Sequence, residues 1–511
     1  MSTITLVEIE TRSGWRHFTD TGGIVIGTTP YAPRLIGNGG YFRHLFAPAA
    51  TLGPGGAEAK PVVLANADRA LDGLHRAVDG RQIVVRQGDR LAGGWASGDI
   101  DDYPPVFRGR IQTAQFAGDT VEMVILSRQE AISETLLMDR RFDGTATSGG
   151  AGIGGNDELA GQPFPVLVGT AFNFAPPFAN AFDQVMQISA GWPGHTVAIG
   201  QVLDRGVALT PGTGHATLAL LLAASPASGV YDWHSGTDGT FIKLGAAPDG
   251  TVTVTATEGG GRTVASCAAF LLGLADSGPV NGAATLAARA SGPAGIWIGP
   301  EDTTIGTALE RVLSGVGWWV DDLNDESVTV GYWDAPQTPV QSIAAWEVLD
   351  PGIELLSSND AGGGSPIREM LIGYRRNHQV LEKSALDAAV ASNVASLLAQ
   401  EYSLAERGDP TVLLENPLAE TLRVDTSLAI LPDAQGIANH QFALRRTGID
   451  IYRVPMATSR VRADIGQSVT LTNPRFGLAG GAVCGVLGRD TTGRRIDGIS
   501  TTDLILWRPT P

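Results

Sequence analysis

One short segment joins aromatic rings to ionisable groups: Tyr231, Asp232, Trp233 and His234. Aromatic side chains offer an apolar face with a polar tip, and carboxylates accept hydrogen bonds from hydroxyl groups. Segments of this kind contact sugars in some proteins, whereas in more proteins they form a buried turn. We therefore take these four residues as the candidate carbohydrate contact, with a buried turn as the alternative.

Acidic residues gather in two places, both in expected turns. The two clusters are Asp99, Asp101 and Asp102, and then Asp321, Asp322, Asp325 and Glu326. Carboxylate oxygens are the ligands that hard divalent cations prefer. Acids in turns are more often solvated, however, and the eight histidines stand singly, without the spacing of metal ligands. The sequence therefore predicts no metal site.

The sequence lacks the signatures of catalysis and of nucleotide binding. It has no phosphate-binding loop ending in Gly-Lys, no HExxH zinc motif and no GxSxG serine elbow. Glycines within 150–155 formally match the dinucleotide fingerprint, but no hydrophobic strand precedes them. Cys267 and Cys484 form no CxxC pair, so one chain cannot supply a cysteine-ligated zinc or iron–sulfur site. We expect a protein that is not an enzyme and holds no cofactor.

The composition is that of a folded protein that does not grip nucleic acid. The 511 residues include 36 basic and 53 acidic side chains, for a formal net charge of −17, and 43% are hydrophobic. This hydrophobic fraction excludes intrinsic disorder, and the acidity disfavours binding to DNA phosphates. We expect no membrane span, because no apolar run approaches about eighteen residues, and we expect synthesis in the cytoplasm, because the first residues lack signal-peptide features.

Alternation and turn residues predict a chain rich in short strands. The 66 glycines provide many positions for tight turns. Alternating residues predict a hairpin over 106–126, turning at Gly118, and an antiparallel meander over 468–507. Periodic apolar residues predict a helix over 305–316, and the stretch 386–405, free of Gly and Pro, predicts the longest helix. The expected fold class is multidomain, β-rich α+β.

Changes of composition divide the chain into five segments. We expect small β-barrel or sandwich domains at both ends, over residues 1–142 and 411–511. Residues 143–158 are small and polar and predict a flexible linker. Residues 159–300 predict a glycine-rich β domain, and residues 301–410 an α/β domain that contains the long helix. The α/β part is thus an insert between β-rich ends.

Several blocks of sequence form a family pattern. They are 309–321 (LERVLSGVGWWVD), 328–332, 372–380, 399–402, 465–471, 475–478, 485–487 and 504–507, with 159–177, 203–209, 63–73 and 107–109 before them. The pattern resembles the tail hub or baseplate hub proteins of long-tailed (siphovirus-type) phages and of gene-transfer-agent-like particles. Some hubs of this family hold an iron–sulfur cluster through cysteines, which Cys267 and Cys484 cannot supply.

The resemblance implies a structural virion protein at the tail tip. In such hubs a homotrimer forms a ring, and two barrels per chain build a pseudo-sixfold collar around the DNA ejection channel. The implied partners are the other copies of the chain, a distal tail protein above the ring, and a tail-tip or central fibre protein below it. DNA would pass through the lumen without specific binding, because a negative wall repels phosphates.

Two other functions remain as alternatives. The chain could be a tail-tip binding module whose middle domain contacts a host cell-surface glycan, with the segment 231–234 as the contact. It could also be a cell-wall hydrolase of the tail, but hydrolysis of a glycan needs two carboxylates facing one another across a cleft. No pair of acids stands out from the turn acids in the sequence.

Overall fold

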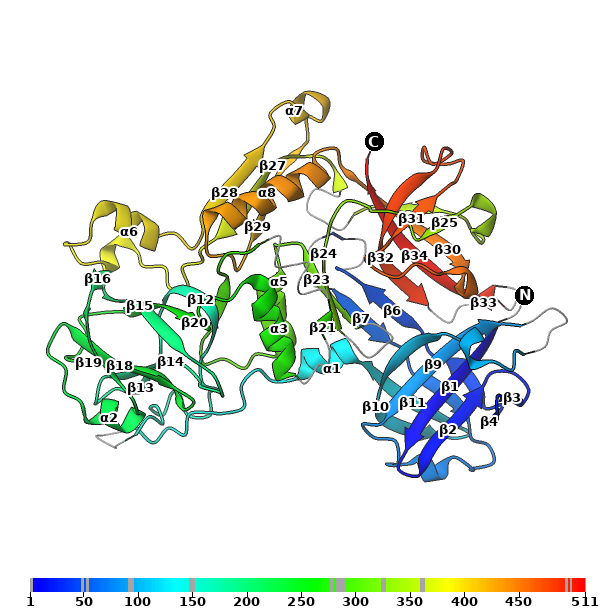
Figure 1. The fold of residues 1–511 in the computed structure, drawn as a ribbon, viewed down its shortest axis with the longest axis horizontal. Coiled ribbons are helices and arrows are strands. Elements are labelled where there is room, and N and C mark those ends of the chain that lie inside the picture. The colour runs from blue at the N-terminus through cyan, green and yellow to red at the C-terminus, as the bar shows by residue number, and fades with distance from the viewer. Residues whose placement is uncertain are drawn as a thin grey trace.

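A computed structural model describes residues 3–46, 50–51, 55–90, 96–146, 152–275, 280–281, 290–322, 328–358, 364–491, 495–496 and 499–510. Strands dominate, and the helices are short, which confirms the predicted fold class. In Figure 1 the sheets of the N-terminal (blue) and C-terminal (red) segments adjoin on one side, and the green middle segment projects from the other. No helix in these ranges is long and apolar enough to cross a membrane.

Seven strands of the N-terminal segment form one sheet whose two ends approach each other. In spatial order they are β2 (Gly14–Thr19), β1 (Thr3–Thr11), β9 (Gln82–Asp89), β10 (Pro105–Ala117), β11 (Thr120–Ser127), β8 (Val62–Ala65) and β5 (Leu35–Asn38). Phe18 in β2 forms an isolated bridge with Ala32, three residues before β5 begins, so the two ends of the sheet approach each other as in a partly closed barrel. The predicted hairpin over 106–126 is confirmed as β10–β11, with Gly118 at φ +57° in its turn.

Alternation along the barrel strands fills the interior. Every second residue of β11 is buried, including Val121, Met123 and Ile125, because side chains of a strand point to opposite faces in turn. Small elements complete this segment: β3 (Ile24–Ile26), β4 (Thr29–Tyr31), η1 (Asp72–Leu74), η2 (Ile100–Asp102) and α1 (Arg128–Glu134). Helix α1 starts at a capping box, in which Ser127 and Glu130 each bond the backbone N–H of the other.

Two five-stranded sheets of the middle segment pack face to face. One has the order β16 (Val207–Ala208), β15 (Val197–Asp204), β20 (Val252–Glu258), β12 (Val166–Phe174), β22 (Gly295–Ile298). The other has the order β13 (Phe178–Asn180), β14 (Val185–Ser189), β19 (Gly239–Leu244), β18 (Val230–Gly236), β17 (Thr210–His215), with α2 (Leu218–Ala223) beside it. Leu167, Ile188 and Val254 belong to the core between the sheets. The result is a β-sandwich.

Helices and two small sheets connect the sandwich to the rest of the chain. They are α3 (Val264–Leu274), α5 (Ile305–Leu313), a sheet of β21 (Val280–Asn281), β24 (Val328–Tyr332) and β23 (Trp318–Asp322), and a sheet of β28 (Ser403–Gly408), β27 (Ile367–Tyr374) and β29 (Glu420–Asp425) under α8 (Leu431–Arg445). The predicted helix at 305–316 is confirmed as α5. The largest buried core of the described chain lies here and contains Leu271, Val312 and Ile372.

The prediction of a long helix over 386–405 is wrong. This stretch contains only α6 (Ser392–Leu398), preceded by η5 (Lys383–Ala385), and residues from 403 onward pair with β27 as β28. Leu386 and Leu398 pack instead with Leu203 of the sandwich, so tertiary contacts override a helical propensity that is only a weak preference. The longest described helix is α8, which the sequence hides because Pro432 and Gly436 lie within it.

The C-terminal sheet incorporates a hairpin from the N-terminal segment. Its strands are β25 (Gln341–Ile343), β31 (Ser468–Leu471), β32 (Ala482–Thr491), β34 (Ile499–Pro509), β30 (Ile449–Ala457) and β26 (Glu354–Leu356), with β33 (Arg495–Ile496), β6 (Tyr41–His44) and β7 (Gly56–Ala59) beside them and η3 (Ala345–Glu347) and η6 (Thr458–Arg460) in the connections. Strand β6 pairs with the end of β32, His44 opposite Gly488. The predicted meander is confirmed as antiparallel β31, β32 and β34, in a different sheet from the β10–β11 hairpin.

The segment predicted as a flexible linker is described over 143–146 and 152–158. The Gly144 and Ala146 N–H groups donate to the carbonyls of Gly154 and Gly155, at 2.8 and 2.9 Å. The Gly155 N–H in turn donates to the carbonyl of Ala179 in the sandwich, at 2.9 Å. Gly150 of the glycine pattern lies outside the described residues. The described parts of this segment therefore contact one another and the sandwich.

Candidate functional site

The candidate carbohydrate residues lie along β18, and the strand separates them onto two faces. Tyr231 and Trp233 belong to the sandwich core, the first buried and the second half-buried. Asp232 and His234 are buried on the opposite face. Period-two alternation of a strand therefore places the rings and the polar groups on different sides of the sheet. The glycan contact stays a prediction.

Two histidine–carboxylate pairs hold the edge of this sheet. The His215 ring nitrogen Nε2 lies 3.0 Å from Asp232 Oδ2, and the His234 ring nitrogen Nε2 lies 2.7 Å from Asp238 Oδ1. Lys243, opposite Asp232 in the strand register, donates from Nζ to the Leu222 carbonyl at 2.6 Å. The first pair ties β17 to β18, and the Lys243 bond ties β19 to α2, so these polar groups are occupied by structural contacts.

The acidic clusters also have structural partners. The Asp99 carboxylate accepts the Asp101 N–H at 3.0 Å at the start of η2. Asp321 lies in β23 and forms an ion pair with Arg43 at 2.9 Å. Asp325 and Glu326 lie outside the described residues. Within the described ranges, no three His, Cys, Asp or Glu side chains are grouped so as to hold a metal ion.

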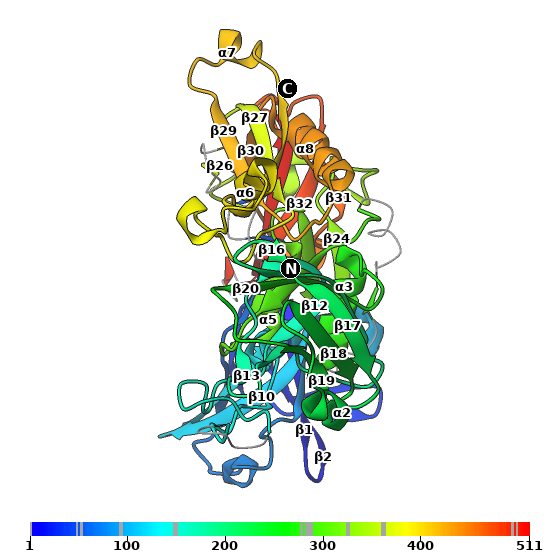
Figure 2. The same cartoon turned by 90° about the vertical axis from the view of Figure 1, so that its left-hand side faces the viewer.

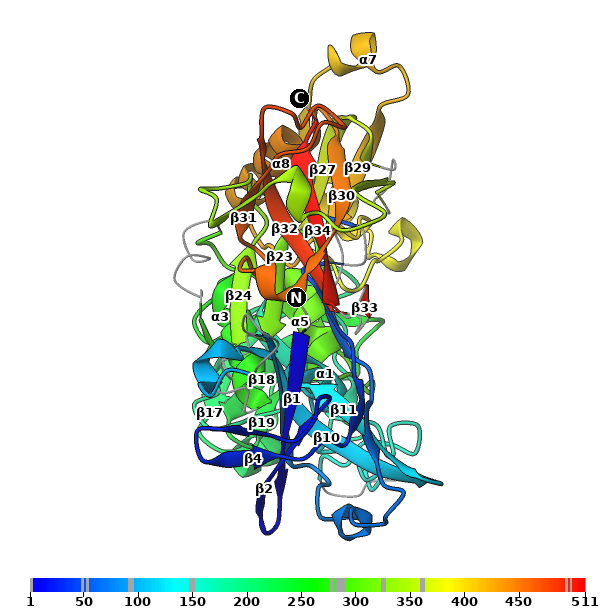
Figure 3. The same cartoon turned by 90° about the vertical axis from the view of Figure 1, so that its right-hand side faces the viewer.

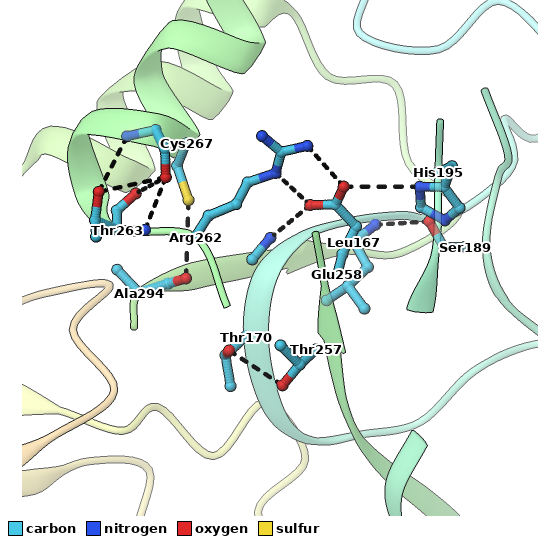
Figure 4. Close-up of polar contacts among 12 residues, drawn as sticks. Leu167, Thr170, Ser189, His195, Thr257, Glu258, Arg262, Thr263, Cys267 and Ala294 are labelled. Carbon is cyan, nitrogen blue, oxygen red and sulfur yellow. Dashed lines mark hydrogen bonds and ion pairs between the residues drawn. The ribbon is translucent and has the colours of Figure 1, made fainter. Parts of the chain in front are cut away.

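A buried cluster of ionisable groups lies where the sandwich meets α3, shown in Figure 4. Strand β20 ends at Glu258, whose side chain is 1% exposed, and a glycine turn leads to Arg262. The Arg262 guanidinium donates to Glu258 from Nε at 2.5 Å and from Nη2 at 2.8 Å. The His195 ring nitrogen Nδ1 lies 4.0 Å from Glu258 Oε1. The next residue, Thr263, caps α3, so the pair fixes the start of that helix on the sheet.

Glu258 also holds an unusual part of β12. The Gly169 N–H donates to Glu258 Oε2 at 3.2 Å, and Gly169 has φ +71°, in the left-handed region that favours glycine. A Cβ at this position would lie 2.1 Å from the Ala294 carbonyl oxygen of the neighbouring chain segment. Carboxylate, guanidinium and a glycine-only backbone position therefore form one structural unit.

We expect Gly169→Ala to destabilise the protein by about 3 kcal/mol, because the left-handed backbone and the backbone clash act together. Gly118→Ala is the matched control: Gly118 also has a positive φ, but nothing lies within 4 Å of its added Cβ. The control substitution should lower the free energy of unfolding by about 1 kcal/mol, because it introduces backbone strain without a clash. Urea unfolding of both variants measures the difference, and equal losses would contradict the role of the clash.

His195 provides a test by pH. Burial lowers the pKa of His195 to about 4, and nearby Glu258 opposes this only in part. An unfolded histidine has a pKa of about 6.5, so between pH 6.5 and 4 the unfolded chain takes up a proton that the folded chain refuses. The stabilisation from neutral His195 is complete above pH 6.5 and is lost as the pH falls, by up to about 3 kcal/mol at pH 4.

We expect His195→Gln to lose less stability than the wild type between pH 7 and pH 4.5, because glutamine does not titrate. Thermal melts of both proteins at the two pH values measure this difference. The comparison removes the contribution of carboxylates that titrate in the same range, since both proteins share them. An equal fall in melting temperature between pH 7 and pH 4.5 for both proteins would contradict the buried neutral state of His195.

The cluster does not have the chemistry of an active site. The Cys267 thiol is buried, and burial raises its pKa to about 12, so it does not form the thiolate needed for nucleophilic attack. Both ring nitrogens of His195 are buried and have no hydrogen-bond partner among the described residues. Neither group reaches solvent. The sequence shows Glu258 and Arg262 four residues apart, but no signal in it joins them to His195 or Gly169.

The chain is similar in structure to tail proteins. No protein-family model and no curated protein matches it. A tail protein from Neisseria meningitidis MC58 is 12% identical, with 99% of this chain and 97% of that chain covered, at a TM-score of 0.45. The 43 kDa tail protein of prophage MuSo2 from Shewanella oneidensis is 9% identical, with 100% and 97% covered, at 0.41. A chain of the virion of a native gene transfer agent particle is 12% identical, with 68% and 84% covered, at 0.41.

Proposed function

We propose that this chain is a structural subunit of a phage-type tail, a hub that forms a homotrimeric ring between tail tube and tail tip around the DNA ejection channel. The sequence blocks that resemble tail hubs support this function. The function needs no catalytic centre, and the buried groups at the sandwich junction act as structural contacts. Its natural location is the tail tip of the virion, between a distal tail protein and a tip or fibre protein.

The observation that carries the proposal is the junction between the two end sheets. The hairpin β6–β7 leaves the N-terminal segment and extends the C-terminal sheet by pairing with β32. Arg43 in β6 forms ion pairs with Asp321 in β23 and with Asp464 in the C-terminal segment, at 2.9 and 2.5 Å. The two β bodies of one chain are thus joined into one block. Three such blocks would present six β bodies around a ring, as a pseudo-sixfold collar requires.

The charge distribution suits a conduit for DNA. Residues 143–410 contain 28 of the 53 acidic residues and 10 of the 36 basic ones, whereas the two ends hold nearly equal numbers of each. A wall with an excess of carboxylates repels phosphates and lets DNA slide without sticking. We therefore expect the negative surface of the channel to come from residues 143–410.

The copy number tests this function. Native mass spectrometry of the full-length chain, or a reconstruction of the particle that carries it, should show three copies in a closed ring. Six copies would place the chain in a distal tail ring instead, and a single copy would contradict the ring. In the reconstruction, a positively charged channel wall would contradict the conduit.

A further inference from the structure

A short arm projects from the three-stranded sheet β28–β27–β29. Residues 409–419 form it, link β28 to β29, and contain α7 (Val412–Glu415). Strands β28 and β29 flank β27 on opposite sides, and their connection passes around the N-terminal end of β27, where Ile367 lies opposite Glu420. Figures 1, 2 and 3 all show α7 as the outermost element at this end of the molecule.

The arm has a defined internal structure. The Asp409 carboxylate accepts hydrogen bonds from the Thr411 backbone N–H, at 3.0 Å, and from its hydroxyl, at 2.6 Å. Val412 and Ala419 are the buried residues of the arm. The Asn416 N–H donates to the Val412 carbonyl at 2.8 Å and closes the turn of α7. These contacts stabilise the turn of α7.

The tip exposes two leucines to solvent. Leu414 is 82% exposed and Leu418 is 90% exposed, and these are the largest values among the exposed large hydrophobic side chains of the described chain. Glu415 and Glu420, both exposed, come before and after Leu418 in the sequence, and Glu415 also directly follows Leu414. Apolar side chains grouped on a projecting element, with charged residues around them, are typical of a surface that another protein covers.

A depression on α8 has the complementary chemistry. It has a volume of about 340 Å³ and is lined by Arg407, Asn439, Phe442, Ala443 and Arg446. The Arg407 guanidinium lies 5.9 Å from the centre of the Phe442 ring. The Arg446 side chain is 54% exposed, and its ion pair with Asp409 is long, at 4.0 Å. The Phe442 and Ala443 side chains offer apolar contact to a leucine, and the two arginines offer partners to the glutamates that flank Leu418.

We propose that the arm tip of one copy docks into the α8 depression of the next copy. The inference rests on the proposed ring of identical subunits and names the contact that closes it. In all three views α7 lies apart from α8 at the outer end of the arm, and among the described residues of the arm only Asp409, at its start, reaches the depression of its own chain, where it pairs with Arg446. Because the tip and the depression are different surfaces, the contact between two copies is head-to-tail. A head-to-tail contact produces a ring when the rotation from one copy to the next adds up to a full turn.

The test compares oligomeric states of full-length variants by native mass spectrometry and by light scattering over a range of concentrations. The tip variant is Leu414→Ser with Leu418→Ser, and the depression variant is Arg407→Glu with Arg446→Glu. Each should raise the concentration needed for trimer formation at least tenfold and leave circular dichroism unchanged. In a mixture of the two variants, the intact tip of the depression variant can still dock into the intact depression of the tip variant. The reverse contact is lost, so the mixture should form heterodimers but no closed ring.

The matched control is Val25→Ser with Ile36→Ser, two exposed apolar residues of the N-terminal barrel, at 60% and 64% exposure. The control should assemble like the wild type. A trimer that survives the tip substitutions contradicts the arm contact and leaves the ring intact. A mixture without heterodimers contradicts the α8 depression as the receptor, and equal loss in the control contradicts the specificity of the tip. A wild type that stays monomeric at every concentration contradicts ring and arm together.

Discussion

Glu258→Ala should lower the free energy of unfolding by about 3–5 kcal/mol, because it leaves the Arg262 charge without its buried partner. The Glu258 carboxylate makes two bonds to the Arg262 guanidinium and one to the Gly169 N–H, and its side chain is almost fully buried. Its loss also frees the start of α3 from the sandwich. Urea denaturation followed by circular dichroism measures the change.

A surface ion pair is the control for this substitution. Glu301 pairs with Arg311 at 2.9 Å, but the two side chains are 55% and 38% exposed. Solvent screens such a pair, so Glu301→Ala should cost at most about 1 kcal/mol. If Glu258→Ala cost no more than this control, the buried cluster would not fix the junction of sandwich and helix.

Arg43→Met should cost about 3 kcal/mol or more and should loosen the joint between the two end sheets. Asp321, 2% exposed at its side chain, loses its Arg43 partner. Burial raises the pKa of the Asp464 carboxyl, but the guanidiniums of Arg43 and Arg489 outweigh this and hold it below its usual value. Without Arg43, one of these two cations is gone. We expect the joint to open before the sheets themselves unfold.

Hydrogen exchange locates this effect. In Arg43→Met, the backbone amides of β6 and of its partner residues 488–491 in β32 should lose protection together, while those of β10 and β11 keep it. The control is Arg453→Met, since Arg453 pairs with Glu354 at 2.8 Å with both side chains about half exposed. Uniform loss of protection across the chain, or none in β6, would contradict Arg43 as the lock of this joint.

Local patterns in the sequence predict much of the fold correctly. The β10–β11 hairpin follows from period-two alternation around Gly118, because a strand with one buried face must alternate and a tight turn needs a residue that accepts a positive φ. Helix α5 follows from apolar residues at helical spacing.

The candidate site shows where sequence reasoning fails. Tyr231 to His234 are neighbours in sequence, yet alternation along β18 puts the rings and the polar groups on opposite faces. The cluster of Glu258, Arg262 and His195 joins residues about sixty positions apart, and its burial depends on how α3 packs on the sandwich. No local pattern contains that information, because any carboxylate or guanidinium in a turn has the same local sequence signal.

The sequence by itself determined the composition, the charge, the β-rich class and the elements whose pattern is local. The tertiary structure alone decided which strand edges meet, such as β6 with β32. It also decided that only a short part of the stretch 386–405 is helical, because its leucines pack against the sandwich. The physical reason is that backbone N–H and C=O groups are alike in every strand, and helical propensity is worth less than about 1 kcal/mol per residue. Partner choice therefore rests on side-chain burial and ion pairs between residues hundreds of positions apart, such as Arg43 and Asp321.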